Sequence, residues 1–141
     1  MGGRPDPSTV AAVSVSRDLR ADDLYDTLVA FYALVETEPL LAPYFAGIDM
    51  RAHMPRIESF WATLLFHTGS YSGSAFQPHL MMPGLTGRHF ERWVATLEAI
   101  LDARFAGSKT EQMKALAHRI AYSMQLRLGI APFAPLQAIG E

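Results

Sequence analysis

Apolar residues recur at helical spacing in four separate stretches of this chain, and no stretch of regular apolar and polar alternation indicates a strand. The stretches span residues 22–38, 50–66, 87–106 and 108–129. Each places apolar side chains three and four residues apart, so that they share one face of a helix. The sequence therefore predicts an all-α domain built from amphipathic helices.

Signals for helix ends stand at the borders of these stretches. Pro39 follows the first stretch, and Thr86 precedes the third as a predicted N-cap. Ser108 and Glu111 form a predicted capping box, in which each side chain satisfies a free backbone N–H at the start of the fourth helix. A glycine follows each of the last two stretches, as is common at helix C-termini.

Composition narrows the classes of function. The chain has 141 residues, half of them hydrophobic, which suffices for one domain with a sizeable core. Its net charge is −2 and its arginines and lysines are scattered, so we expect no nucleic-acid partner. Because the chain has no cysteine, disulfides, iron–sulfur clusters and thiolate-bound metals are excluded.

The two ends of the chain differ in composition from its centre. We expect residues 1–20 to be a flexible N-terminal extension, 21–130 to be the folded domain and 131–141 to be a flexible C-terminal tail. The first residues lack the charged and then apolar order of a signal peptide, and the longest apolar runs fall short of the ~20 residues that span a bilayer. A soluble, cytoplasmic protein without membrane contact is therefore expected.

The segment between the second and third predicted helices, residues 67–86, is long for a compact helical domain. Segments of this length often carry function. Within it, His79 lies between Pro78 and the pair Pro83-Gly84, which frame a very short helical stretch with apolar neighbours. Such a frame aims the imidazole, and neutral imidazole is a common ligand of metals and of haem iron. His79 is therefore the leading candidate for a metal ligand.

The apolar stripe of the second predicted helix begins with a histidine, His53. The side chains that continue it at helical spacing are Ile57, Phe60, Trp61 and Leu64. Pro55 lies two residues after His53, and a proline deep in a helix clashes with the carbonyl four residues before it. We therefore expect residues 51–54 to be the first turn of the helix or to be distorted.

Other metal sites lack their signatures. A carboxylate-bridged di-iron bundle needs paired Glu-x-x-His motifs, and a zinc hydrolase needs His-Glu-x-x-His or three clustered ligands; neither pattern occurs. Tyr32 and Trp93 lie on apolar stripes and would by themselves be interpreted as core residues. The histidines that match no ligand position, and are predicted at the surface, are His67, His89 and His118. The methionines are predicted to fill packing gaps.

Several short motifs occur together between Leu24 and Leu128. They are Phe31-Tyr32, Pro43-Tyr44-Phe45, His53 with Phe60-Trp61, Tyr71-Ser72-Gly73, His79-Leu80-Met81-Met82-Pro83 and Phe90-Glu91-Arg92-Trp93. In order and separation they resemble the landmarks of the truncated haemoglobins, and within that family those of group III. Each motif alone is weak, and the resemblance rests on their combination.

The resemblance implies a globin-like two-over-two helical sandwich that encloses one haem b. His79 then corresponds to the proximal ligand of the iron. Tyr32, His53 and Trp93 correspond to the residues of the distal side, where dioxygen, CO or NO binds. Residues 21–130 would form the truncated globin domain.

Four further residues are expected to contact the haem under this resemblance. Phe45 corresponds to the corner phenylalanine that packs against the haem face, and Arg56 is our candidate for pairing with a propionate. Tyr71 and Ile57 complete the expected haem contacts.

The expected distal residues suit a ligand that acquires negative charge. A tyrosine hydroxyl and an indole N–H are both donors, and two hydrogen bonds of about 1–2 kcal/mol each would slow ligand release by tens to several hundredfold. Slow release argues against oxygen delivery and favours redox chemistry on nitric oxide or peroxide, with a reductase as electron donor. A haem-based sensor or ligand store without turnover is the alternative, and the sequence leaves both open.

Overall fold

The computed structural model describes residues 17–69 and 84–130, and in these ranges every regular element is helical. The α-helices are α2 (Leu24–Val35), α3 (Met50–Phe66), α5 (Gly87–Arg104) and α6 (Ser108–Arg127). Two short 3-10 turns, η1 (Ala21–Asp23) and η2 (Ala42–Tyr44), flank α2 along the chain. The predicted all-α class is confirmed, and each predicted helix is present with ends shifted by a few residues at most.

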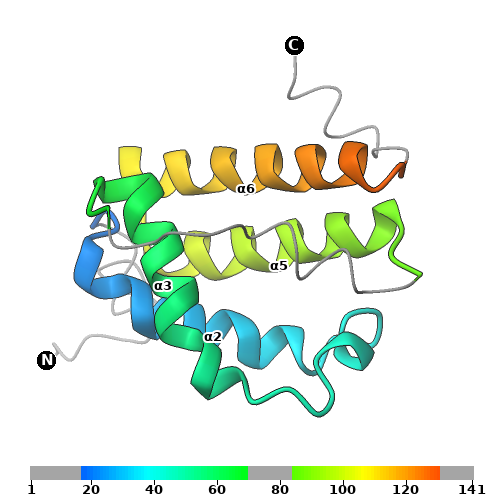
Figure 1. The fold of residues 1–141 in the computed structure, drawn as a ribbon. Coiled ribbons are helices and arrows are strands. Elements are labelled where there is room, and N and C mark those ends of the chain that lie inside the picture. Colours follow the sequence, from blue (N-terminus) through cyan, green and yellow to red (C-terminus); the bar gives the residue numbers. More distant parts are fainter. Residues whose placement is uncertain (1–16, 70–83, 131–141) are drawn as a thin grey trace, which may run out of the picture.

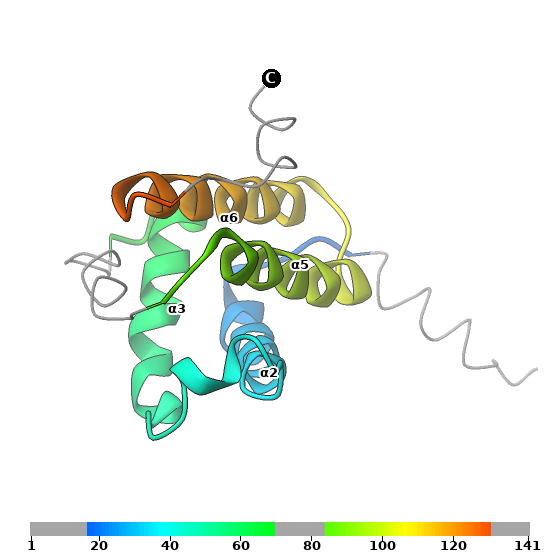
Figure 2. The same ribbon diagram turned by 90° about the vertical axis from the view of Figure 1, so that its right-hand side faces the viewer.

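The helices pack as two pairs. α5 and α6 lie side by side and antiparallel, while α3 crosses the stack of α6, α5 and α2 at a steep angle (Figures 1 and 2). α2 packs on α3 within the second pair, and contacts of α2 with α5 and of α3 with α6 join the two pairs. The chain therefore has the two-over-two arrangement of a helical sandwich.

The core lies where the apolar faces of these helices meet. α2 contributes fully buried side chains that lie about one turn apart along its inner face, from its first residue to its last. These are Leu24, Leu28, Phe31 and Val35. The matching faces of α5 and α6 supply Val94, Leu97, Leu101, Met113 and Ala117. Burial of apolar area on this scale is the main term that holds the pairs together.

The orientation of α3 differs from the predicted stripe. Its fully buried side chains are Met54, Trp61 and Leu65, whereas Ile57 and Phe60 of the predicted stripe stay half-buried. The helix runs without interruption through Pro55, which is its sixth residue. Proline has no N–H to donate to the carbonyl of Arg51.

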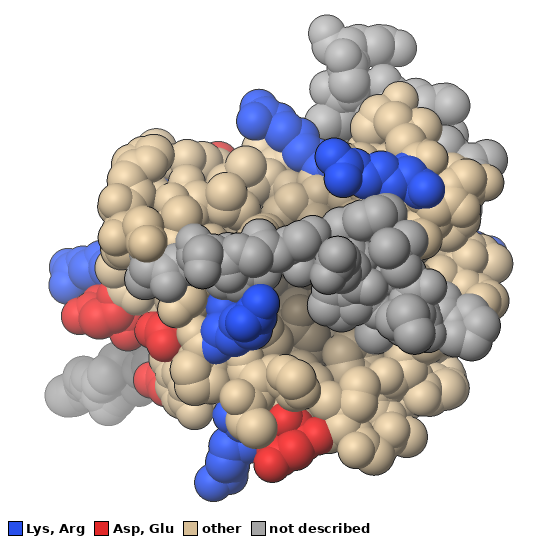
Figure 3. Space-filling view, viewed as in Figure 1, with Lys and Arg blue, Asp and Glu red and all other residues tan. Residues whose placement is uncertain are grey.

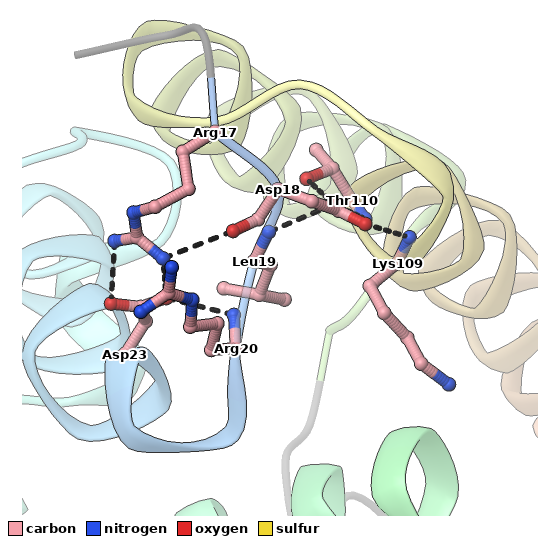
Figure 4. Close-up of polar contacts among 7 residues, drawn as sticks. All are labelled: Arg17, Asp18, Leu19, Arg20, Asp23, Lys109 and Thr110. Atoms are coloured by element: carbon pink, nitrogen blue, oxygen red, sulfur yellow. Dashed lines mark hydrogen bonds and ion pairs between the residues drawn. The ribbon is translucent and has the colours of Figure 1, made fainter.

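The start of α6 is capped by a residue distant in sequence, and not by the predicted box of Ser108 and Glu111. The N-cap position is Gly107, and the Asp18 carboxylate accepts from the backbone N–H of Lys109 at 2.8 Å and of Thr110 at 2.9 Å (Figure 4). It also accepts from the Thr110 hydroxyl at 2.7 Å and from the N–H of Leu19 at 2.8 Å. The capping-box prediction is wrong, because the N-cap is Gly107 and not Ser108, and the N–H of Glu111 bonds to the Gly107 carbonyl.

Residues 17–20 differ in structure from the flexible extension predicted for them. Leu19 is 2% exposed within the main core, and the Arg17 guanidinium donates to both carboxylate oxygens of Asp23, at 2.8 and 2.9 Å. The backbone carbonyl of Arg17 also accepts from the N–H of Ala106. The rest of the predicted extension, 1–16, and the predicted tail, 131–141, lie outside the described residues, as do residues 70–83.

Candidate functional site

Aromatic side chains from α2, α5 and the turn after η2 gather at one place in the fold. The ring of Tyr32 lies 4.7 Å from that of Phe31 and 5.9 Å from that of Phe45, measured between centroids. Trp93 reaches the same cluster from α5, with its ring 5.8 Å from Phe31. The structure thus brings together Tyr32, Phe45 and Trp93, which the sequence pattern predicted as site residues from three different elements.

The two polar members of this aromatic cluster, Tyr32 and Trp93, both contact Phe31. The indole N–H can only donate, and Trp93 acts on the pKa of the Tyr32 hydroxyl as a donor to its oxygen would. The pKa of the Tyr32 hydroxyl is raised, because burial disfavours the phenolate, and Trp93 offsets part of that rise. Tyr32 therefore keeps its own proton at neutral pH and can donate it to a further acceptor.

Both polar members of the cluster retain some accessible surface, although Phe31 between them has none. Protein surrounds the Tyr32 hydroxyl closely enough to raise its pKa, yet the side chain is only half-buried. Part of its ring is therefore accessible at the surface of the described residues. Figure 3 shows a recess near the centre of the molecular face that carries α3.

The inner side of α3 supplies a second, apolar wall. Ile57, Phe60 and Leu64 follow one another at helical spacing and are all half-buried, while packing against the main core on one side. They leave partly exposed apolar surface on this side of α3, whereas Trp61 of the predicted stripe is buried.

His53 and Arg56 lie near the start of α3, and both are exposed. His53 is in the first turn of the helix, so its side chain lies at the edge of the α3 wall and not deep within it. Arg56 has a partner in the structure and is one residue before Ile57 on the helix. The exposed positions suit a histidine at the mouth of a recess and a cation at its rim.

Two of the predicted site residues, His79 and Tyr71, lie outside the described residues. Their expected roles as iron ligand and haem contact therefore stay predictions. Among the residues that the structure describes, no three histidine, aspartate or glutamate side chains cluster closely enough to hold a metal ion.

Two histidines predicted at the surface have structural roles instead. Nδ1 of His89 accepts the backbone N–H of Thr86 at 3.0 Å, which closes the start of α5, and its ring packs edge-on against Tyr44. His118 pairs with Glu98 across α5 and α6, with 2.8 Å between Nε2 and the carboxylate. Both side chains are only partly exposed, because their partners come from the helix start and the neighbouring helix. His67 is exposed, as predicted.

The prediction that methionines fill packing gaps holds for Met54, Met113 and Met124, which are all buried in the core. The sequence pattern did not reveal that Trp93 acts on the pKa of Tyr32. No local pattern could have shown this, because the two residues are 61 positions apart in the chain. In the described part of the chain, no helix is both long and apolar enough to cross a bilayer.

Comparison with known proteins gives one informative match. No family model matches the chain, and no curated protein does. Among solved structures, the chain is similar to the group III truncated hemoglobin from Campylobacter jejuni, with a TM-score of 0.70 and 25% sequence identity. The match covers 78% of this chain and 91% of the other.

Proposed function

We propose that this chain, which has the fold of a group III truncated haemoglobin, binds a b-type haem and uses it to bind dioxygen and related diatomic gases. The observation that supports this most directly is the aromatic cluster of Tyr32, Phe45 and Trp93, which packs against the same core as the half-buried apolar stripe of α3. A polar pair and an apolar wall are the two surfaces that a gas-binding haem pocket needs.

The residues present fit a haem. The macrocycle is flat and largely apolar, and it needs apolar side chains against its face. Ile57, Phe60 and Leu64 offer such surface along α3, and Phe45 adds an aromatic ring beside Tyr32. Covering these side chains would contribute stability at about 25 cal/mol per Å² of apolar area removed from water.

The roles that follow from the family resemblance are assigned to particular residues. His79 holds the iron on the proximal side, and Tyr71 contributes a contact from the same stretch of chain. Phe45 and Ile57 pack against the macrocycle. Arg56, exposed on α3, pairs with a propionate at the rim.

When bound, the haem iron supplies the coordination position for the gas and the electrons for its redox chemistry. The protein supplies the donors around that position. Tyr32 keeps its proton, because burial raises the pKa of the hydroxyl, and it donates that proton to a ligand that carries partial negative charge. One such hydrogen bond is worth about 1–2 kcal/mol, or roughly tenfold in ligand dissociation.

Trp93 supports this donor in two ways. Its N–H lowers the pKa of the Tyr32 hydroxyl, as a donor to the oxygen does, and so polarises the phenol O–H. Its half-exposed edge also allows the indole to turn toward a ligand that accepts a second hydrogen bond. Strong retention of the gas is expected, which favours chemistry on nitric oxide or peroxide over oxygen delivery.

The test is the absorption spectrum of the purified protein in the ferric, ferrous and ferrous-CO states, compared with that of His79→Gly. Wild-type protein should show a b-type haem, and the variant should lose it or regain a five-coordinate spectrum only with added imidazole. An unchanged haem content and spectrum in His79→Gly would refute His79 as the ligand. Absence of haem from wild-type protein after reconstitution would refute the proposed function.

Turnover distinguishes an enzyme from the sensor or store. Nitric oxide consumption by the oxygenated protein over many cycles, supported by an electron donor, marks a dioxygenase. A single stoichiometric reaction per haem marks a store or sensor.

A further inference from the structure

We infer that a groove between α3 and α6 is a binding site for a small carboxylate with an apolar tail, of the class of medium-chain fatty acids. The groove has a volume of about 230 Å³. Its lining side chains are Phe60 from α3 and Arg119, Ile120, Ser123, Met124 and Arg127 from α6. The inference does not depend on haem, because no residue of α6 takes part in the proposed haem contacts.

The lining of the groove divides into an apolar floor and a polar edge. The side chains of the floor, which are buried or half-buried, are Phe60, Ile120 and Met124. Arg119, Ser123 and Arg127 are exposed and follow one another at intervals of four residues, so they share one edge of α6. A ligand that contacts both parts of the groove has an apolar body and a polar head.

The charge of the polar edge favours a negative head. Both of its charged residues are arginines, and α6 has no acidic residue after Glu111. The ion pairs between α6 and α5 use Lys114 and His118. Among residues 17–69 and 84–130, no carboxylate pairs with Arg119. Basic side chains lie along α6 on the molecular face that carries α3 (Figure 3). The guanidinium of Arg119 is therefore available to an anion.

The spacing along α6 indicates where the head lies. Arg119 and Arg127 are separated by about 12 Å along the helix axis, and Ser123 lies midway between them. The long arginine side chains can converge on this midpoint from both sides, and a guanidinium donates two parallel hydrogen bonds to a carboxylate. The Ser123 hydroxyl adds a third donor at the same place. A carboxylate beside Ser123 thus meets donors from three residues.

The size of the groove limits the tail. At about 230 Å³ the groove is smaller than the ~300–1,000 Å³ of sites for drug-sized ligands, so it suits a single short chain. Each CH₂ group buried against the apolar floor strengthens binding by roughly fourfold. Octanoate combines such a chain with a carboxylate and is therefore the probe.

The test is a titration of the full chain with octanoate, followed through the methyl NMR signals of Ile120 and Met124. It is carried out on the haem-free and on the ferrous-CO protein. The signals should shift in both forms, because octanoate and haem do not compete for α6. Unmoved signals in both forms would overturn the inference. Shifts in the haem-free form alone would place octanoate in the haem cavity and would also overturn it.

Two analogues separate the contributions of head and tail. Octanol keeps the tail without the charge, and acetate keeps the charge without the tail. Each should bind at least about tenfold more weakly than octanoate. Octanol binding as tight as that of octanoate would show that the arginines play no part, and equally tight acetate binding would show the same of the floor. Either result contradicts the inference.

Substitutions locate the site on the groove. Arg119→Gln and Arg127→Gln should each weaken octanoate binding roughly three- to tenfold, whereas Arg88→Gln, exposed on α5 outside the groove, should not. Ser123→Leu fills the groove and should abolish binding although both arginines remain. Ala115→Leu adds the same bulk at an exposed position of α6 outside the groove and should leave binding unchanged. Affinities that do not differ between these variants and their controls would overturn the assignment.

Discussion

At the scale of single residues, the proposed gas binding depends on the Tyr32 hydroxyl and the Trp93 indole. Burial raises the pKa of Tyr32, so it keeps its proton, and Trp93 acts on that pKa in the opposite direction, as a donor to the Tyr32 oxygen would. The two donors are therefore not independent, and each variant alters what the other residue can do. Residues in one hydrogen-bond network commonly show coupling of 0.5–3 kcal/mol in mutant cycles.

Removing either donor should speed the release of dioxygen. We expect Tyr32→Phe and Trp93→Phe each to raise the dissociation rate by roughly tenfold, for about 1.4 kcal/mol per lost hydrogen bond. In the double variant, the dissociation rate should rise by less than the product of the two single increases, because Trp93 acts partly through Tyr32. Stopped-flow kinetics measures the dissociation rate of dioxygen from wild type, the two single variants and the double variant. Rates within twofold of wild type in both single variants would show that other groups hold the ligand.

His53 calls for a different expectation, because it is exposed in the first turn of α3 and not part of the aromatic cluster. We expect it to control access, so His53→Leu should change the association rates of dioxygen and CO more than the dissociation rate of dioxygen. Flash photolysis and stopped-flow mixing measure both. A large rise in dissociation with unchanged CO association would instead identify His53 as a direct stabiliser of the ligand.

At the scale of elements, the helix starts of this fold are closed by side chains of different origin. Asp49 caps α3 from the adjacent position, His89 closes α5 from within its first turn, and Asp18 caps α6 from the far end of the domain. The last arrangement requires a glycine at the N-cap. A Cβ at Gly107 would lie 2.4 Å from the Asp18 carboxyl carbon.

This distant cap ties the first described residues to the last helix. Its loss should therefore destabilise the whole domain. We expect Asp18→Asn to lower the free energy of unfolding by about 1–2 kcal/mol, since the variant loses the negative charge and some of the acceptors at the start of α6. Asp26→Asn, at an exposed position in α2, is the control and should change the free energy of unfolding by only a few tenths of a kcal/mol. Urea unfolding followed by circular dichroism measures both, and equal effects would contradict the capping role.

At the scale of the whole molecule, stability at low pH depends on the same carboxylate. Burial raises the pKa of Asp18, but the hydrogen bonds from Lys109, Thr110 and Leu19 outweigh it and lower the pKa to about 2, from 3.8. A carboxyl whose pKa is lower in the folded state stabilises the fold above its unfolded pKa. That contribution is lost as the pH falls through the folded value.

The difference in unfolding free energy between wild type and Asp18→Asn should therefore be constant above about pH 5 and shrink between about pH 4 and pH 2. Urea titrations of both proteins at a series of pH values measure it. Asp23, whose pKa is lowered chiefly by its hydrogen bond with Arg17, contributes in the same direction in both proteins and cancels in the comparison. A difference that does not depend on pH would contradict the assignment.

The sequence by itself determined the helices, because apolar periodicity and the proline and glycine positions act locally. The extents of α3, α5 and α6 follow from patterns such as the stripe around Trp61 and the break before Thr86. It also singled out Tyr32, Phe45 and Trp93 as site residues, through motifs that occur in combination.

Only the tertiary structure decided which of these side chains meet and how. The ring contact of Phe31 with Trp93, the cap that Asp18 places on α6 and the pair of His118 with Glu98 all join residues distant along the chain. The rotation of α3, which leaves Ile57 half-buried, also depends on the helices that pack against it. Local patterns carry no information about such partners, because the energies that select them arise only once the helices are packed.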